Sequence, residues 1–213
     1  INDTLTNIKG CPEMWDGIGV AAGKVVQSPK GRAELFAGTL LENAHTGAKT
    51  LGKGHAPGVI RVSNSTLKNN RIHLDIDGSY QPPQALWHVF INAEFLCTGP
   101  LADFNTYKGE GTKYFIQLFN VSKPIPVKNC TFKNTALFTP FAGGTGIKSI
   151  NSRFDATDSC LFYGLEYGVD ALSYNSAITF TVTGSDFFFV HKNIRMSNIN
   201  NTTITQNTMG ICG

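Results

Sequence analysis

The stretch Val62-Ser63-Asn64-Ser65-Thr66-Leu67-Lys68-Asn69 decides the fold that we predict, because versions of it return along the whole chain. Each version centres on an apolar residue, and the centres are Leu40, Leu67, Phe95, Phe132, Phe154, Phe187 and Ile204. The residue two positions before each centre is small, from Gly38 in the first version to Thr202 in the last. The residue three positions before is most often asparagine: Asn64, Asn92, Asn129, Asn151 and Asn201.

This local pattern predicts two short strands that meet at a sharp corner. Asparagine is the residue other than glycine that best tolerates the left-handed backbone such a corner needs. After the corner, the small residue and the apolar residue share one face of a strand, because side chains alternate with a period of two. The residue between them, such as Thr39, Thr66 or Glu94, should then face solvent.

Strands that recur every few tens of residues, without helical patterns between them, are typical of a solenoid whose coils bury a continuous core. Three short strands per coil fit the shorter spacings, and the longer ones require two loop insertions, at residues 96–126 and 155–181. Stacked coils would place asparagines above one another, joined by amide hydrogen bonds. Parallel crossovers are nearly always right-handed. The sequence thus predicts an all-β, single-stranded, right-handed parallel β-helix that forms one domain over residues 1–213.

The composition narrows the class of protein. Of 213 residues, 41% are hydrophobic, whereas only 15% are charged, well under the roughly 25% of an average globular protein. The 18 basic and 15 acidic residues contain no basic run, so a nucleic-acid partner is not predicted. No stretch approaches the roughly 18 apolar residues of a membrane span. A polarity based on Asn, Thr, Ser and Gly is typical of secreted β proteins.

The cysteines and the chain ends add further expectations. Cys11, Cys97, Cys130, Cys160 and Cys212 include no CxxC pair and no zinc-finger spacing with histidine, so no structural metal and no cofactor is predicted. Cys130 falls in the small inward column and is expected in the core. The other four could pair in an oxidising compartment, with a connectivity that stays open. Because the chain starts without Met and stops within an apparent coil at 203–211, we expect a fragment of a longer protein.

One segment carries a resemblance to a known family. The run Cys11-Pro12-Glu13-Met14-Trp15-Asp16-Gly17-Ile18-Gly19-Val20, the Asn-Ser-Thr-Leu repeats and the closing Asn207-Thr208-Met209-Gly210-Ile211 resemble large secreted Bacteroidota proteins with parallel β-helix repeats. The resemblance covers most of the chain and implies export to the cell surface or the medium. It also implies handling by the type IX secretion machinery through a C-terminal region outside this sequence. We expect Trp15 to be buried. For Trp87 the sequence does not decide between a buried and an exposed position.

Two sets of residues are candidates for a site. The strand at 72–78 alternates, so Ile72, Leu74 and Ile76 should face the core, and the outer face should carry His73, Asp75 and Asp77. Two carboxylates beside a histidine could bind a cation or act as acid and base, or they form a solvated strand face. The two expected loops carry aromatic and acidic residues that suit carbohydrate or pack against the coil: Tyr107, Tyr114, Tyr163, Glu166, Tyr167 and Asp170.

Three classes of function remain. The first is a non-enzymatic structural or adhesive module at the cell surface, whose loops contact glycans or other surface proteins. The second is a polysaccharide lyase or glycosidase, which would need acidic and basic groups on neighbouring coils. The third is a trimeric, phage-like tail fibre. Because no Ser-His-Asp order, nucleophile elbow or phosphate-binding glycine loop occurs, we favour the first class.

Overall fold

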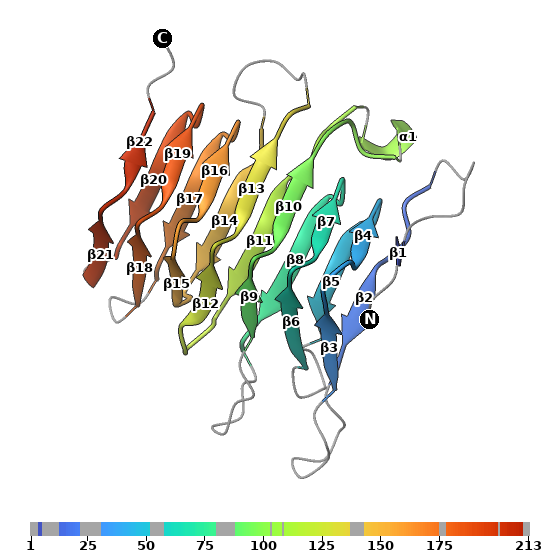
Figure 1. Ribbon diagram of the computed structural model, residues 1–213. Helices are drawn as coiled ribbons and strands as arrows, with labels where there is room; N and C mark the ends of the chain where they lie inside the picture. The colour runs from blue at the N-terminus through green and yellow to red at the C-terminus, as the bar shows by residue number, and fades with distance from the viewer. Residues whose placement is uncertain are drawn as a thin grey trace.

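The computed structural model describes residues 4–5, 13–21, 31–51, 58–79, 88–102, 104–107, 109–136, 143–174, 178–199 and 201–210. Within them the chain winds into a right-handed parallel β-helix whose coils stack along one axis (Figure 1). The predicted fold class is therefore confirmed. A four-residue helical turn, α1 (Phe104–Tyr107), lies within one coil, in the connection between two of its strands.

Each full coil contributes one strand to each of three parallel sheets, here called sheets 1, 2 and 3 in the order in which the chain visits them. Sheet 1 contains β1 (Thr4–Leu5), β4 (Leu40–Glu42), β7 (Thr66–Lys68), β10 (Glu94–Cys97), β13 (Thr131–Asn134), β16 (Leu161–Tyr163), β19 (Asp186–Phe188) and β22 (Thr208–Met209). Sheet 2 contains β2 (Ile18–Val20), β5 (Thr46–Thr50), β8 (Ile72–Asp77), β11 (Tyr114–Phe119), β14 (Thr145–Ile150), β17 (Tyr167–Leu172) and β20 (Lys192–Ser197). Sheet 3 contains β3 (Arg32–Leu35), β6 (Val59–Ser63), β9 (Val89–Ile91), β12 (Ile125–Lys128), β15 (Phe154–Thr157), β18 (Thr179–Thr183) and β21 (Asn201–Thr205).

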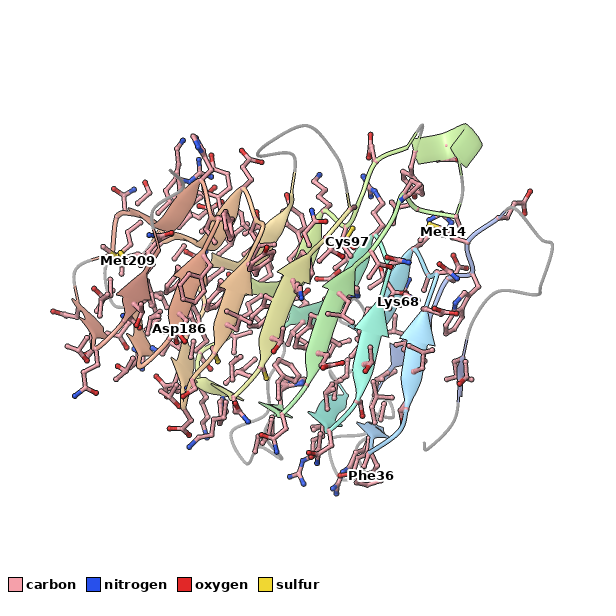
Figure 2. The ribbon with its side chains drawn as sticks, turned by 45° about the horizontal axis from the view of Figure 1, so that its top comes forward. Met14, Phe36, Lys68, Cys97, Asp186 and Met209 are labelled. Carbon is pink, nitrogen blue, oxygen red and sulfur yellow. The ribbon has the colours of Figure 1, made fainter. Side chains whose placement is uncertain are left out.

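The chain passes between sheets at three long edges, which we call the 1–2, 2–3 and 3–1 edges. Figure 2 shows the extent of sheet 1, along which Lys68 of β7, Cys97 of β10, Asp186 of β19 and Met209 of β22 follow one another. Because neighbouring parallel strands are about 4.8 Å apart, residues aligned across a sheet form straight columns. These columns organise both the core and the surface.

A column of large apolar side chains fills the core beneath sheet 1. It runs through Leu5, Leu41, Leu67, Phe95, Phe132, Phe162, Phe187 and Met209. The phenyl rings are nearly parallel, with centroids 5.0 Å apart between Phe95 and Phe132 and 4.7 Å apart between Phe132 and Phe162. Full burial of each such side chain contributes about 1.5–3 kcal/mol relative to leaving it in water.

Three of the seven predicted centres are wrong. Leu40 is half-buried and aligns with Thr66, whereas Leu41 takes the core position. Phe154 and Ile204 lie in sheet 3, where they align with other residues of that sheet and not with the sheet 1 column. Their counterparts in sheet 1 are Phe162 and Met209.

The corner before Leu41 explains the first of these errors. It holds one residue more than the corner before Leu67, because Leu35 aligns with Val62. Gly38 is consequently exposed and takes the left-handed conformation, with φ of 85°. Thr39, which we expected to face solvent, is the small buried residue of this coil.

The other errors arise because two edges use the same local chemistry. Asn151 and Ser152 lead into sheet 3 across the 2–3 edge, just as Asn64 and Ser65 lead into sheet 1 across the 3–1 edge. Both asparagines are left-handed, with φ of 48° and 51°, and both serines are buried. The sequence pattern therefore does not distinguish the 2–3 edge from the 3–1 edge.

The predicted loops at 96–126 and 155–181 are also wrong, since both ranges contain regular strands, including β11 and the start of β12 in the first and β16 and β17 in the second. The coil of Phe162 turns through Asp158 and Ser159, with φ of 60° and 68°, so it lacks the asparagine that marks other corners. The chain does leave the regular coil between β10 and β11, where α1 lies.

The predicted asparagine ladder is present at the 3–1 edge. Asn64, Asn92 and Asn129 are left-handed, with φ of 51°, 52° and 48°. Asn92 Nδ2 donates to Asn64 Oδ1 over 3.1 Å, and Asn129 Nδ2 donates to Asn92 Oδ1 over 2.9 Å. Asn201 does not belong to this ladder, because it lies in β21 opposite Thr179, and Gln206, with φ of 55°, turns that coil instead.

A second, shorter ladder stands at the 2–3 edge. Asn151 Nδ2 donates to Asn120 Oδ1 over 3.2 Å, and Asn120 Nδ2 donates to Ser79 Oγ over 2.9 Å. Asn120 is left-handed as well, with φ of 51°. The prediction for Asn151 is thus correct in conformation but wrong in edge.

The cysteines that the structure describes are free thiols. Cys130 is in the core, as predicted, and Cys160 lies in the same column one coil further on. Burial raises the pKa of Cys130 to about 12 and that of Cys160 to about 11. Cys97 is also free and buried, so neither it nor Cys160 pairs as we had allowed. Cys11 and Cys212 lie outside the described residues.

Of the two tryptophans, the structure describes Trp15. Trp15 is half-buried, packs against the core and donates from Nε1 to the Glu42 carbonyl over 2.8 Å. Its burial is therefore less complete than expected. Trp87 lies outside the described residues.

Candidate ligand-binding edge

His73 does not lie on the predicted acidic outer face, because it is fully buried. Strands of sheet 2 place two consecutive residues inward near their start, a pattern that recurs in β5, β8 and β11. The strict alternation that we assumed therefore fails at His73. Ile72, expected in the core, instead shares a column with Tyr114 and is half-buried.

His73 sits in an apolar cage. Its ring centroid is 5.0 Å from that of Phe115 and 6.1 Å from that of Phe95. Asn70 Nδ2 lies 3.0 Å from His73 Nδ1, which accordingly accepts while Nε2 carries the proton. Burial lowers the pKa of His73 to about 3, although the Leu96 backbone acts in the opposite direction. The residue is a neutral part of the core and takes no part in a surface site.

Asp75 and Asp77 do lie on the outer face of sheet 2, and both are half-buried. Burial raises the pKa of Asp75, and the charge of Asp77 raises it further, while Lys49 and Gln117 act against them. Lys49 and Gln117 are the residues aligned with Asp75 on its two sides, so no second carboxylate faces Asp75 from a neighbouring coil. Within the described part of the chain, no group of three or more His, Cys, Asp or Glu residues is placed to hold a metal ion.

The aromatic candidates gather along the 1–2 edge. Tyr163 ends β16 and Tyr167 begins β17, so the turn that carries Glu166 brings these three residues to one place. Tyr114 begins β11 and shares the outward column of Tyr167, with Thr145 between them. Tyr107 reaches the same edge from α1, where its hydroxyl lies 2.7 Å from His45 Nδ1.

Each of these tyrosine rings lies close to a cation. The distances from cation to ring centroid are 4.8 Å for Arg71 and Tyr107, 5.1 Å for Lys113 and Tyr114, 5.4 Å for Lys133 and Tyr163, 5.3 Å for Lys192 and Tyr167, and 4.2 Å for Arg195 and Tyr167. Exposed pairs of this kind contribute about 0.5–1 kcal/mol each. The edge therefore carries a row of cation–π pairs whose rings belong to two coils, those of β11 and β17.

Asp170, which was also predicted to bind a ligand, is nearly buried and pairs with two cations of the protein. Its side chain is only 7% exposed and binds Lys148 Nζ over 2.5 Å. Arg195 makes a bidentate pair with it, from Nε over 2.7 Å and from a terminal nitrogen over 2.6 Å. Burial opposes ionisation, but the hydrogen bonds from Arg195 and Lys148 outweigh it and hold the pKa of Asp170 below its usual range. Asp170 thus orients Arg195, whose other terminal nitrogen donates to the Tyr167 hydroxyl over 3.1 Å.

Phe189 belongs to this edge and was missed by the sequence analysis. It is 54% exposed, and its ring meets that of Tyr163 edge-on, with centroids 5.2 Å apart. Its φ of 54° is left-handed, at a corner where other coils place Asn43, Asn69 and Gly164. A bulky residue is an outlier in this conformation, and such strain costs on the order of 1–3 kcal/mol and tends to mark functional sites.

A signal for Phe189 was present in the run Phe187-Phe188-Phe189. Alternation places Phe187 in the core and Phe188 outward, so a third consecutive phenylalanine has no regular place. Reading it as a surface residue would have required knowing that the corner follows at once.

A hollow of about 550 Å³ lies between β2 and β3, near the N-terminal end of the molecule. It is lined by apolar residues such as Ile18, Val20 and Phe36, and its Arg32 and Glu34 pair with each other. It contains none of the predicted site residues, whereas the 1–2 edge gathers the predicted tyrosines and is therefore the candidate site.

Within the described residues, no helix has the length and apolar character needed to cross a membrane. Comparison with protein-family models, with curated proteins and with solved structures found no match to the chain.

Proposed function

We propose that the chain is a non-enzymatic, secreted or cell-surface β-helix module that binds glycans or other surface proteins along its 1–2 edge. The observation that carries the proposal is the strained and exposed Phe189, which stands beside Tyr163 in a row of aromatic and cationic side chains. The exposed ring of Phe189 can pack against the apolar face of a sugar, and its polar neighbours can bind hydroxyl groups. The stacked coils supply the rigidity that a surface site needs.

The surroundings of the charged groups favour binding over catalysis. Asp170 is held as an ion by Lys148 and Arg195, and its side chain is almost fully buried, so it has no proton to donate to a ligand. A second candidate, a lyase or glycosidase, is favoured by the raised pKa of Asp75 beside Asp77, because perturbed carboxyl groups are common in active sites. That alternative places the site on the face of sheet 2, away from the aromatic row.

A secreted or surface location is the part of the proposal that rests on composition and on the resemblance to exported β-helix proteins. A low share of charged residues and a surface of Thr, Asn and Ser support it. Digestion of intact cells with a protease, followed by immunodetection, tests it. Protection of the protein until the cells are lysed would refute this location.

The functional test is a screen of anionic and neutral polysaccharides with the purified protein, with and without calcium. Binding is followed by calorimetry, and turnover by the appearance of unsaturated products and reducing ends. We expect binding without turnover, weakened in Tyr163→Ala and Tyr167→Ala. Tyr174→Ala is the matched control, because Tyr174 is 75% exposed but lies beyond the other end of β17. Turnover that disappears in Asp75→Asn or Asp77→Asn would overturn the proposal in favour of the enzyme.

A further inference from the structure

We propose that the ligand of the 1–2 edge is an acidic linear glycan that lies parallel to the solenoid axis, an inference that rests on the proposed function. The charge along the edge supports it. Among the described residues the cations of the cation–π row are Arg71, Lys113, Lys133, Lys192 and Arg195. Glu166 precedes Tyr167 in the chain and Asp170 follows it in β17, and Asp170 is already neutralised by its two partners.

The arrangement of these cations favours a linear partner. Lys133 aligns with Tyr163 on the next coil, and Lys192 aligns with Tyr167 on the preceding one. The coils repeat at about 4.8 Å, which is close to the length of one sugar unit in an extended polysaccharide. A polymer that carries one acidic group on each or every second unit would therefore meet positive charge repeatedly as it follows the edge.

The tyrosine rings prepare the cations for binding. A lysine held over a ring has already lost part of its rotamer freedom, so an incoming anion immobilises it at a lower entropic cost. Lys113, Lys192 and Arg195 nevertheless keep exposed side chains. Each can bond a carboxylate or a sulfate on the side that faces away from the ring.

The same features disfavour a single-stranded nucleic acid. Proteins that bind such strands stack bases on free aromatic faces, whereas the faces of Tyr114, Tyr163 and Tyr167 are approached by cations. Phe189 supplies an exposed ring for a sugar beside Tyr163.

The test compares matched acidic and neutral polymers by calorimetry. The probes are polygalacturonate and alginate, each against its methyl-esterified form, dextran sulfate against dextran, and an oligomer of thymidylate. We expect at least one acidic glycan to bind about tenfold more tightly than its neutral counterpart, with an affinity that falls as salt is added. The carboxylate and sulfate probes show which anion the edge accepts.

Substitutions then locate the binding. Lys133→Gln and Lys192→Gln should each weaken the acidic glycan about two- to fivefold, and Lys128→Gln should leave it unchanged. Lys128 is a matched control, because it is an exposed lysine at the 3–1 edge, where it pairs with Asp158. Equal loss in all three variants would contradict the proposed location.

Phe189→Asn separates binding from folding. Asparagine accepts the left-handed corner, so the variant should unfold at a higher temperature than the parent while binding the glycan about two- to tenfold more weakly. If the role of Phe189 is purely structural, the variant will change the unfolding temperature and leave the glycan affinity unchanged.

The outcomes distinguish the two levels of the proposal. Equal binding of acidic and neutral glycans overturns the inference about charge and leaves glycan binding in place. Binding of none of the glycans overturns both the inference about charge and glycan binding by the 1–2 edge. Tighter binding of the thymidylate oligomer than of every glycan replaces the ligand class with nucleic acid.

Discussion

An asparagine at the 3–1 edge meets two physical demands at once. The backbone must turn through a left-handed conformation, which costs most residues about 1–2 kcal/mol. The stacking of coils also brings the side-chain amides of successive corners within hydrogen-bond distance, where they can bond with one another. Asn129 meets the first demand with φ of 48° and the second by donating to Asn92. Glycine can meet only the first, and valine neither.

The cost in stability of replacing Asn129 should therefore depend on which of these two demands the new residue meets. Asn129→Gly loses the ladder bond and should cost about 0.5–1.5 kcal/mol, whereas Asn129→Val adds backbone strain and should cost about 2–3 kcal/mol. Asn201→Val is the control, because Asn201 lies in an exposed strand where a β-branched residue is favoured. Chemical denaturation measures all three, and equal effects of Gly and Val at position 129 would contradict the assigned conformation.

His73 makes stability depend on pH. The pKa of a histidine is 6.5 before burial, and burial lowers that of His73 to about 3 and that of His88 to about 4. Below pH 6.5 these two histidines bind protons in the unfolded chain, whereas in the folded chain they stay neutral until the pH approaches their lowered pKa values. Both residues therefore contribute stability that is present above pH 6.5 and is lost as the pH falls toward 3.

His73→Phe should flatten this dependence. Phenylalanine suits the site because Phe115 takes the same place in the next coil. Unfolding midpoints in urea, measured from pH 7.5 to pH 4, should fall less steeply in the variant than in the parent, and the slope that remains reflects His88 and the carboxylates. His191→Gln, at an exposed position, should keep the parent slope. A slope unchanged in His73→Phe would show that His73 is already protonated or exposed.

At the scale of the strand, the column beneath sheet 1 sets the register. Each strand of sheet 1 is only a few residues long, and a slip by one residue would exchange its inward and outward side chains. In β4 the two alternatives are adjacent leucines, of which Leu41 is fully buried and Leu40 half-buried. These two residues offer an internal comparison.

Truncation of the two leucines should differ sharply. Leu41→Ala removes a fully buried side chain and should cost about 2–5 kcal/mol, whereas Leu40→Ala removes a half-buried one and should cost less than about 1.5 kcal/mol. Thermal unfolding of the two variants provides the measurement. A larger loss from Leu40→Ala would restore the register that the sequence pattern first indicated.

The strand scale also shows what could be predicted from sequence. The periods of two residues and of one coil are determined by side-chain alternation and by the need to bury one face, so the β-helix itself and core residues such as Leu67, Phe95 and Phe132 followed from the pattern. The assignment of each strand to a sheet did not follow. Asn151 and Ser152 satisfy at the 2–3 edge the same backbone demand that Asn64 and Ser65 satisfy at the 3–1 edge, and a local pattern carries no record of which edge it serves.

The candidate site was predictable in part for a related reason. Tyr163, Glu166 and Tyr167 were found because aromatic and acidic residues concentrate there, although the explanation by a loop was wrong. His73 was misplaced because two consecutive residues of β8 face inward, which a strict alternation cannot express. The cations of the row were missed altogether, since Lys133 and Lys192 are far from their tyrosines in sequence and meet them only when the coils stack.

Taken as a whole, the solenoid is a rod whose last coils leave some of their inward-facing side chains exposed to solvent. In the last coils the inward columns continue, but Met196 and Met209 are 46% and 51% exposed because no described strand covers them. The aromatic and cationic row follows the rod from Arg71 to Arg195. Only a stack in this register can bring its members into one line.

The most direct test of that line is a footprint of lysine reactivity in the presence of a bound acidic glycan. The protein is acetylated under limiting conditions with and without saturating polymer, and the rate at each lysine is read by mass spectrometry. The proposal predicts slower acetylation at Lys113, Lys133 and Lys192 and an unchanged rate at Lys128 on the 3–1 edge. Protection of Lys128 with no protection of the other three would place the ligand elsewhere and contradict a binding site on the 1–2 edge.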